Sequence, residues 1–281
     1  MISRRSFLAT TTAATALLAF SPQLFAMGNN NQLKNFGFIG GIIGKELKDD
    51  WKAALKKAAE FGFTEIETGN FYGKSAKKFL NYCAEVGIKP VVGGVNFSTD
   101  KDELNKKLDL LQKMNIQQAV TYWPWKVGAP FKLEDCKTSA EILNTMGEVC
   151  KSRGINFSWH NHNNEFIPME QGLPFDYLME NTQKDLVKCE MDIYWVAKGG
   201  ADPLSVLKKY AGRIPILHVK DMAPGEAKDF ECPGSGIIDF PSIFREANAQ
   251  GIKHFMVERD NVPDGMACLK SSGAYLKNLT F

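Results

Sequence analysis

Hydrophobic and polar positions follow two different periods along the chain. Short apolar runs of strand type, such as FGFIGG at 36–41, precede longer segments in which apolar residues recur every three or four positions. The segment 49–62 has this helical spacing, with apolar side chains at Trp51, Ala54, Leu55 and Ala58. The pattern therefore predicts a strand followed by an amphipathic helix.

The same strand-then-helix pattern occurs eight times. The predicted strands are 36–41, 65–68, 90–97, 118–123, 155–162, 186–195, 214–222 and 254–260. Several helical segments end in glycine just before the next apolar run, and glycine favours the left-handed C-cap of a helix. Strand–helix alternation predicts a parallel sheet, and eight units predict an α/β fold of the closed (β/α)8 TIM barrel type. The alternative is a doubly wound open sheet, but FIGGIIGK at 38–45 lacks the G-x-G-x-x-G spacing of its phosphate turn.

The N-terminal residues 1–26 predict a cleavable export signal. Arg4 and Arg5 precede an apolar run at 7–20, and SRRSFL matches the twin-arginine signature, which a receptor reads as an address. We therefore expect a periplasmic protein with one barrel domain over residues 27–281. The alternative is an uncleaved membrane anchor, but the run is short for a span. We expect no stable membrane insertion once the signal is removed.

The charge balance argues against a polyanionic partner. The chain has 34 Lys and Arg against 32 Asp and Glu, and loss of the two signal arginines would leave no net charge. We therefore expect no nucleic-acid partner. The six cysteines lack C-x-x-C spacing, and we interpret them as mostly buried small hydrophobes with room for one disulfide. They are Cys83, Cys136, Cys150, Cys189, Cys232 and Cys268.

Polar residues gather where the later predicted strands end, which is where TIM barrels carry their active sites. The stretch WHNHNNEF at 159–166 alone holds two of the four histidines of the chain. The strand-end candidates are Glu67, His160, Asp192, His218, Lys220 and Glu258. We expect at most one of His160 and His162 to face the barrel mouth.

Taken together, four of these candidates predict a metal site, because they lie on four consecutive strands. They are His160, Asp192, His218 and Glu258. Carboxylates mixed with imidazoles suit Mn²⁺, Zn²⁺, Co²⁺ or Fe²⁺ better than Ca²⁺. Each residue alone has an ordinary structural explanation: a core histidine for His218, a helix cap for Asp192, a surface charge for Glu258. The prediction rests on their shared position in the barrel.

Five motifs resemble the xylose-isomerase-like barrel superfamily, the sugar phosphate isomerase/epimerase group, over nearly all of residues 33–281. They are WHNHNNEF, EMDIYWVAKGGADP, ILHVKDM, PGSGIIDFPSIF and FMVERDN. The resemblance implies one divalent metal ion (Mn, Zn, Co, Fe or Mg) bound by Asp192, His218 and Glu258. His160 would complete the metal shell, where epimerases of this group carry a glutamate that also shuttles the substrate proton. The His-rich fifth strand, PGSGIIDF and VERDN look more like inosose dehydratases and exported relatives that act on 3-keto-sugars.

The resemblance implies a metal-dependent isomerase or epimerase that acts on a keto-sugar through an enediolate. The metal would polarise the carbonyl, with Glu258 as ligand and base. Glu67 and Lys220 would supply the second acid/base or contact substrate hydroxyls. One alternative is a lyase or dehydratase of a 3-keto-glycoside or keto-cyclitol, and another is a non-catalytic periplasmic sugar-binding barrel. A three-metal hydrolase of the endonuclease IV type is set aside, because four histidines are too few.

The remaining candidates concern substrate contacts. His162 or Glu165 would contact the substrate or orient the metal shell. Trp123 and Trp195 are predicted to stack on a sugar ring, although packing between barrel and helices would explain them equally well. No phosphate-binding loop or arginine clamp occurs, so we expect a neutral keto-sugar, glycoside or cyclitol as small-molecule partner. A homo-oligomer is compatible with the sequence.

Overall fold

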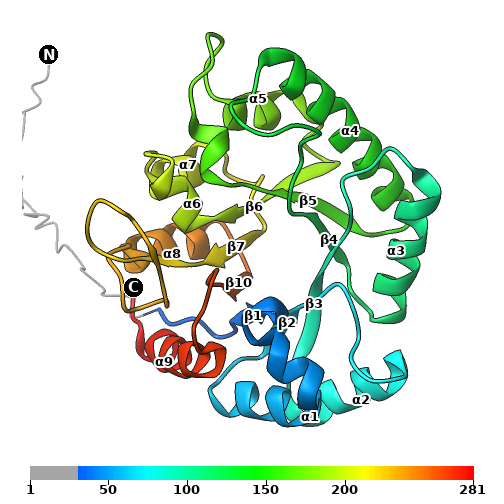
Figure 1. The fold of residues 1–281 in the computed structure, drawn as a ribbon, viewed down its shortest axis with the longest axis vertical. Coiled ribbons are helices and arrows are strands. Elements are labelled where there is room, and N and C mark those ends of the chain that lie inside the picture. Colours follow the sequence, from blue (N-terminus) through cyan, green and yellow to red (C-terminus); the bar gives the residue numbers. More distant parts are fainter. Residues whose placement is uncertain (1–30) are drawn as a thin grey trace, which may run out of the picture.

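The computed structural model describes residues 31–281, which form a closed eight-stranded barrel surrounded by helices (Figure 1). The strands are β1 (Gly37–Ile39), β2 (Glu65–Glu67), β3 (Lys89–Gly94), β4 (Gln118–Thr121), β5 (Asn156–His160), β6 (Val187–Asp192), β7 (Ile216–Val219) and β10 (His254–Val257). All neighbouring pairs are parallel, in the order β1-β10-β7-β6-β5-β4-β3-β2. The predicted barrel is confirmed and the open sheet is excluded. The predicted export signal lies outside the described residues.

Helices follow the strands in turn and cover the outside of the barrel. They are α1 (Gly44–Glu60), α2 (Ala76–Val86), α3 (Lys101–Lys113), α4 (Leu133–Ser152), α5 (Pro174–Asn181), α6 (Ile193–Lys198), α7 (Pro203–Lys209), α8 (Phe240–Ala249) and α9 (Gly265–Asn278). Their ends follow local chemistry: Ser75 caps the start of α2 through the Lys78 N–H, and Gly87 ends it with a φ of 78°. Within residues 31–281, no helix is long and apolar enough to cross a bilayer.

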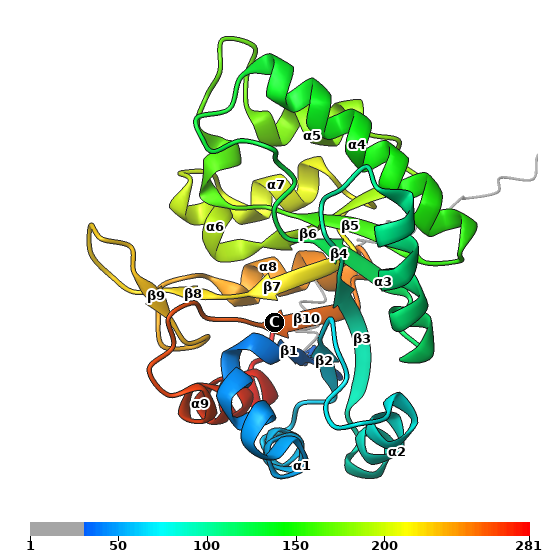
Figure 2. The same cartoon turned by 45° about the vertical axis from the view of Figure 1, so that its right-hand side comes forward.

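Two segments differ from the predicted elements. The run 186–195 was predicted as one strand, but β6 stops at Asp192, whose side chain accepts a hydrogen bond from the Trp195 N–H and so begins α6. A second, antiparallel sheet was not predicted. It pairs β8 (Asp221–Met222) with β9 (Phe230–Glu231) and extends beyond the end of β7 (Figure 2).

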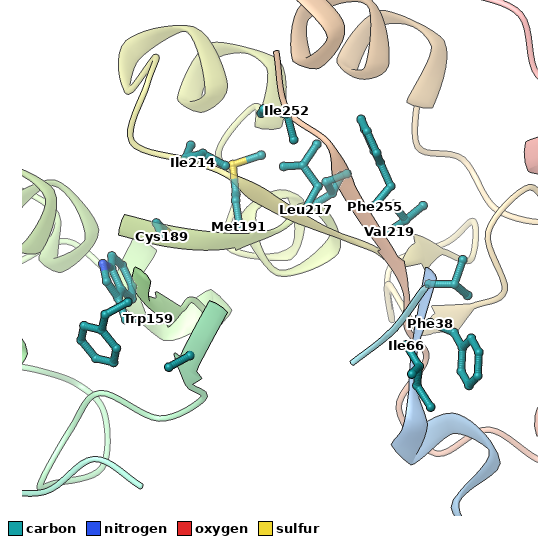
Figure 3. Packing of buried hydrophobic residues seen from close by; sticks show 14 of the residues in the cluster. Phe38, Ile66, Trp159, Cys189, Met191, Ile214, Leu217, Val219, Ile252 and Phe255 are labelled. Carbon is teal, nitrogen blue, oxygen red and sulfur yellow. The ribbon is translucent and has the colours of Figure 1, made fainter. Parts of the chain in front are cut away.

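Most of the hydrophobic core lies between the barrel wall and the helices. Outward-facing side chains such as Trp159, Met191 and Leu217 are completely buried there (Figure 3). The barrel interior holds only a small apolar cluster, formed by Val91, Val92, Val120, Ile216 and Met256. The interior above this cluster is polar.

The cysteines behave as predicted. Cys232 and Cys268 form a disulfide, and the other four are free and buried. Burial raises the pKa of the Cys83 thiol to about 12 and that of Cys136 to about 11. These free thiols are therefore suited to packing rather than to catalysis.

Candidate active site at the barrel mouth

Two imidazoles and two carboxylates meet at the C-terminal ends of four neighbouring strands. His160 ends β5, Asp192 ends β6, His218 lies on β7 and Glu258 directly follows β10. One potential ligand atom from each lies within 4.8 Å of the others. Asp192 and His218 are paired in register across β6 and β7, which explains their proximity. We call these four residues the tetrad.

His218 lies at the centre of a ring of carboxylates. Its Nδ1 lies 2.7 Å from Glu258 Oε2, while its Nε2 lies 3.0 Å from Glu67 Oε2 and 2.6 Å from Glu190 Oε1. Burial alone would lower the pKa of His218, but the negative charges of Glu190, Glu67 and Glu258 raise it well above its usual value. Nδ1 of His218 therefore faces Glu258 of the tetrad, while Nε2 contacts two carboxyl groups outside it.

Glu67 and Glu190 form a completely buried layer beneath the tetrad. Tyr122 donates a hydrogen bond to Glu67 Oε1 at 2.5 Å. Burial and the nearby Glu67 raise the pKa of Glu190 to about 8. Glu190 was missed from the sequence, although it lies two positions before Asp192 and side chains two apart share a strand face.

Lys220 is completely buried beside the tetrad. Its Nζ lies 2.6 Å from Asp260 Oδ2, 3.2 Å from Asp192 Oδ2 and 3.3 Å from Glu258 Oε2. Although burial opposes ionisation, the cations Lys220 and His218 hold the pKa of Glu258 well below its usual value. Burial raises the pKa of Asp192 to about 7, against the opposing effect of Lys220.

The side chains of the tetrad fit a divalent metal ion. His160 Nδ1 is buried and lacks a hydrogen-bond partner, which is costly unless something else satisfies it, and Asp192 Oδ2 makes no hydrogen bond besides its ion-pair contact with Lys220. Burial and the neighbouring His218 and His162 lower the pKa of His160 far below its usual value, so its nitrogen lone pair is available at neutral pH. Two imidazoles with two carboxylates are a donor set for zinc, manganese, cobalt or iron.

His162 lies beside the tetrad and contacts both predicted tryptophans. Its ring centroid lies 5.1 Å from that of His160, 5.4 Å from Trp123 and 5.4 Å from Trp195. The prediction that at most one of the two histidines faces the mouth is wrong, because residues two positions apart point to the same side of an extended chain. Trp123 is 39% exposed, so its ring is open to a molecule in the mouth.

Glu165 has a different position from the one predicted for a substrate contact. It is completely buried, with Oε1 accepting from Trp125 Nε1 at 2.6 Å and Oε2 accepting from the His162 backbone N–H at 2.7 Å. Burial raises its pKa to about 7. The roles predicted for Glu165 were substrate contact and orientation of the metal shell. This geometry favours an orienting role, because Glu165 holds the backbone of His162 beside the tetrad.

Comparison with known proteins agrees with this fold. The sequence profile of the xylose isomerase-like TIM barrel family matches residues 55–278. An inosose dehydratase of Clostridium perfringens is 30% identical over 258 residues, covering 81% of this chain and 80% of that protein.

Two solved structures share the fold. A sugar phosphate isomerase/epimerase of Parabacteroides distasonis superposes with a TM-score of 0.74 at 24% identity, covering 92% of this chain and 98% of that one. The IolI protein, solved with a bound zinc atom, superposes with a TM-score of 0.70 at 15% identity, covering 88% of this chain and 99% of that one. The chain belongs to the xylose isomerase-like TIM barrel family.

Proposed function

We propose that this protein is a divalent-metal-dependent enzyme that removes a proton next to the carbonyl of a keto-sugar or keto-cyclitol and then eliminates a neighbouring oxygen substituent. The observation that carries the proposal is the tetrad, in which one partly exposed carboxylate lies beside three buried ligands. The Glu258 side chain is 15% exposed, while the Asp192 and His218 side chains are completely buried and that of His160 is 4% exposed.

The four side chains of the tetrad would hold the metal. When bound, the metal would polarise the substrate carbonyl and so acidify the adjacent C–H bond. Glu67 and Glu190 would hold His218 from behind, as carboxylates commonly do for metal-bound histidines. This position favours an orienting role for Glu67 over the acid/base role predicted from the sequence.

Glu258 is the best placed base. Its low pKa keeps it ionised at neutral pH, but also makes it a weak base that acts only on a strongly acidified C–H bond. After taking the proton from carbon, the same carboxyl can return it to a leaving oxygen on the same face of the substrate. One carboxylate is therefore enough for elimination.

Epimerisation, which we predicted first, requires proton return on the opposite face. The other carboxylates around the tetrad are unsuited to this, since Glu67 and Glu190 are completely buried and Asp260 is held by Lys220 at 2.6 Å. His160 stands at the fourth ligand position and is not a carboxylate. Elimination is accordingly the leading candidate, and isomerisation of the same keto-sugar is the second.

The proposed substrate class follows from the aromatic side chains at the barrel mouth and from the activity of a relative. His162, Trp123 and Trp195 offer flat faces for a sugar or cyclitol ring. The Clostridium perfringens relative is an inosose dehydratase, which supports a keto-cyclitol here, with a 3-keto-glycoside as the alternative. We further propose a periplasmic location, supported by the SRRSFL sequence and by the Cys232–Cys268 disulfide, because disulfides persist in oxidising compartments.

Metal content is the first test. Residues 27–281 would be purified and analysed by mass spectrometry beside His218→Ala and Glu258→Ala. We expect one Mn, Zn, Co or Fe per chain, lost in both variants. The metal-loaded protein would then be incubated with keto-sugars and keto-cyclitols, and NMR would distinguish an unsaturated product from an isomer. A protein that stays metal-free after reconstitution would refute the proposal and favour a sugar-binding barrel.

A further inference from the structure

The segment between β7 and α8, residues Asp221–Asp239, borders the tetrad on one side. Its hairpin β8–β9 places Phe230 against Trp195, with ring centroids 5.5 Å apart, and against Tyr194 at 5.0 Å. Lys220 Nζ lies 5.4 Å from the centre of the same phenyl ring. Phe230 is therefore in contact with a proposed substrate contact and with the lysine beside Glu258. We call residues Asp221–Asp239 the wall.

Backbone pairing alone is weak in this wall. Each strand of the hairpin has two residues, and isolated two-stranded hairpins are marginally stable in water. The position of Phe230 must therefore depend on other contacts.

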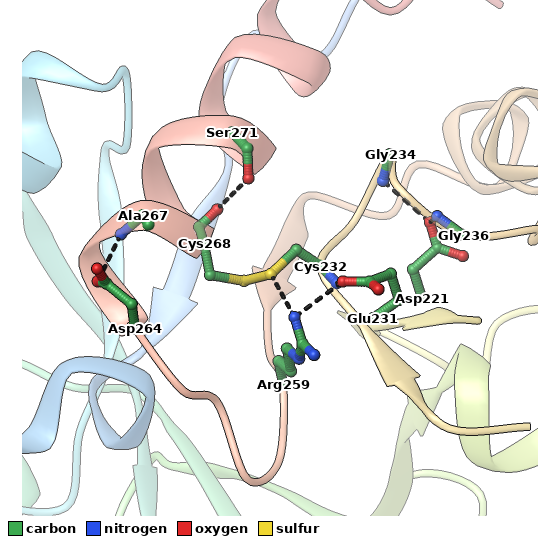
Figure 4. Close-up of a disulfide and its surroundings, with 10 residues drawn as sticks. All are labelled: Asp221, Glu231, Cys232, Gly234, Gly236, Arg259, Asp264, Ala267, Cys268 and Ser271. Atoms are coloured by element: carbon green, nitrogen blue, oxygen red, sulfur yellow. Dashed lines mark hydrogen bonds and ion pairs between the residues drawn. A yellow bond between two sulfur atoms is a disulfide. The ribbon is translucent and has the colours of Figure 1, made fainter.

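Asp221 provides the first of these contacts from within the wall. The side chain is buried, and its two oxygens accept hydrogen bonds from the backbone N–H groups of Met222, Gly234, Gly236 and Ile238 at 2.8–3.1 Å. Figure 4 shows the two glycines beside this carboxylate. A Cβ atom on Gly236 would lie 2.3 Å from Asp221 Oδ1, so only glycine fits there. Asp221 thus fixes the part of the wall that follows β9.

The disulfide provides the second contact and connects the wall to another part of the barrel. Cys232 directly follows β9, and Cys268 lies in α9, the helix after the strand that leads to Glu258 (Figure 4). Between them, Arg259 Nη1 donates to Glu231 Oε1 at 2.8 Å and lies 3.1 Å from Cys232 Sγ. The covalent bond therefore joins the end of the hairpin to α9.

We propose that the Cys232–Cys268 disulfide is a positioning element of the active site: it holds Phe230 against Trp195 as a fixed boundary for substrate, so that substrate binding depends on the oxidised state. The proposal rests on the proposed function of the tetrad. Without the covalent bond, binding must order the hairpin, and ordering one side chain lowers affinity by about two- to tenfold. The tetrad is built from strands that the disulfide does not join, so metal binding is retained.

Reduction provides a direct way to break the connection. A water-soluble phosphine cleaves the S–S bond, is oxidised to the phosphine oxide with oxygen from water, and leaves two thiols that carry the protons of that water. A phosphine is preferred to a dithiol, because thiolates bind the same metals as the tetrad. Alkylation followed by mass spectrometry would measure the extent of reduction.

The test compares oxidised wild type, phosphine-treated wild type and the double variant Cys232→Ser/Cys268→Ser. The double variant with phosphine is the matched control, because the four remaining cysteines are buried and free in every sample. Three quantities would be measured: amide hydrogen exchange of residues 222–239, metal content, and KM against kcat for the substrate. Phe230→Ala, with the disulfide intact, would test the side chain separately.

We expect faster exchange in residues 222–233 after reduction and in the double variant, with unchanged metal content. KM should rise about two- to tenfold with a smaller change in kcat, and Phe230→Ala should reproduce that rise. Phosphine should have no further effect on the double variant. Unchanged exchange and unchanged KM in a fully reduced protein would overturn the proposal.

The test of the disulfide and the test of the proposed function can fail independently of each other. If no keto-sugar is turned over, hydrogen exchange still decides whether the disulfide holds the wall. If turnover and metal content are as proposed but reduction changes neither exchange nor KM, only the inference about the disulfide is wrong. If the double variant does not fold, reduction of folded wild type provides the same comparison.

Discussion

His218 Nε2 lies 2.6 Å from Glu190 Oε1, so the imidazole at the centre of the tetrad rests on a buried carboxyl group from the next strand. The opposite nitrogen, Nδ1, faces Glu258 at 2.7 Å. Such an arrangement fixes the ring orientation and the tautomer of a metal-binding histidine. Glu190 is therefore expected to influence metal binding without contacting the metal.

Glu190→Gln replaces the ionisable carboxyl group behind His218 with an uncharged amide of the same size. We expect metal affinity to fall about 10- to 100-fold, as is typical when a carboxylate partner of a histidine ligand is lost. Competition with a chelator would measure the change. The matched control is Glu65→Gln, which alters another carboxylate–imidazole pair inside the barrel, 2.9 Å from His254 and away from the tetrad. Equal affinities for wild type and Glu190→Gln would contradict this role.

Lys220→Met removes the cation that lies against Asp192 and Glu258. We expect kcat to fall about 10²-fold or more, because Glu258 loses the charge that holds it ionised and in place. Metal affinity should stay the same or increase, since a positive charge beside the metal is removed. Steady-state kinetics and chelator competition would separate the two effects.

Lys198→Met is the control for Lys220. Lys198 also lies over the Trp195 ring, at 5.7 Å, but bonds Tyr194 and the Lys228 carbonyl instead of the tetrad. A similar loss of kcat in both variants would mean that the effect comes from lost packing against the Trp195 ring and its neighbours, and not from the charge beside Glu258.

Metal affinity should depend on pH through Asp192. Its pKa of about 7 means that a proton occupies the carboxyl group at lower pH, and the metal must displace that proton. We expect affinity to fall at least about tenfold for each pH unit below 7, and to keep rising above pH 7 because His218, whose pKa is raised well above its usual value, must also lose a proton. His160 adds no such competition, because its pKa is far below the usual value. Calorimetry in buffers of different ionisation enthalpy would count the released protons, and a flat profile from pH 5.5 to 7 would oppose this account.

Much of the site followed from the sequence because barrel architecture places strand ends together. The periodicity located eight strands, and their polar last residues gave the members of the tetrad as neighbours, as the structure places them. What a residue does among those neighbours was harder to predict. Glu67 was predicted as a second acid/base or a substrate contact, and Glu165 as a substrate contact or a residue that orients the metal shell. Both are completely buried, and the depth of a side chain depends on strand register and tilt, which the sequence pattern does not give.

Other features depend on contacts between distant segments. The disulfide joins cysteines 36 residues apart, and six cysteines without a spacing motif do not define a pairing. The β8–β9 hairpin has two residues per strand, too few for an alternating pattern to be visible. Asp221 was visible only as part of the HVKD stretch, and its four backbone partners lie up to 17 residues further along the chain.

Asp221→Asn tests how strongly the wall depends on its buried carboxylate. An amide offers one oxygen, so either orientation directs its NH₂ group at two backbone N–H donors that the carboxylate now satisfies: Gly234 and Gly236, or Met222 and Ile238. We expect a loss of about 3 kcal/mol in the free energy of unfolding, seen as a fall in Tm of roughly 6–12 °C. Differential scanning calorimetry would measure it.

Asp264→Asn makes the same chemical change nearby and is the control. Asp264 caps the start of α9 by accepting from the Ala267 N–H at 2.9 Å, and asparagine caps helices about as well as aspartate. We expect its Tm to stay close to that of wild type. If Asp221→Asn were equally harmless, the carboxylate would not be what holds residues 234–238 in place, and the disulfide would be the principal support of the wall. A large loss in Asp221→Asn, with none in Asp264→Asn, would mean that the buried carboxylate supports the wall from within.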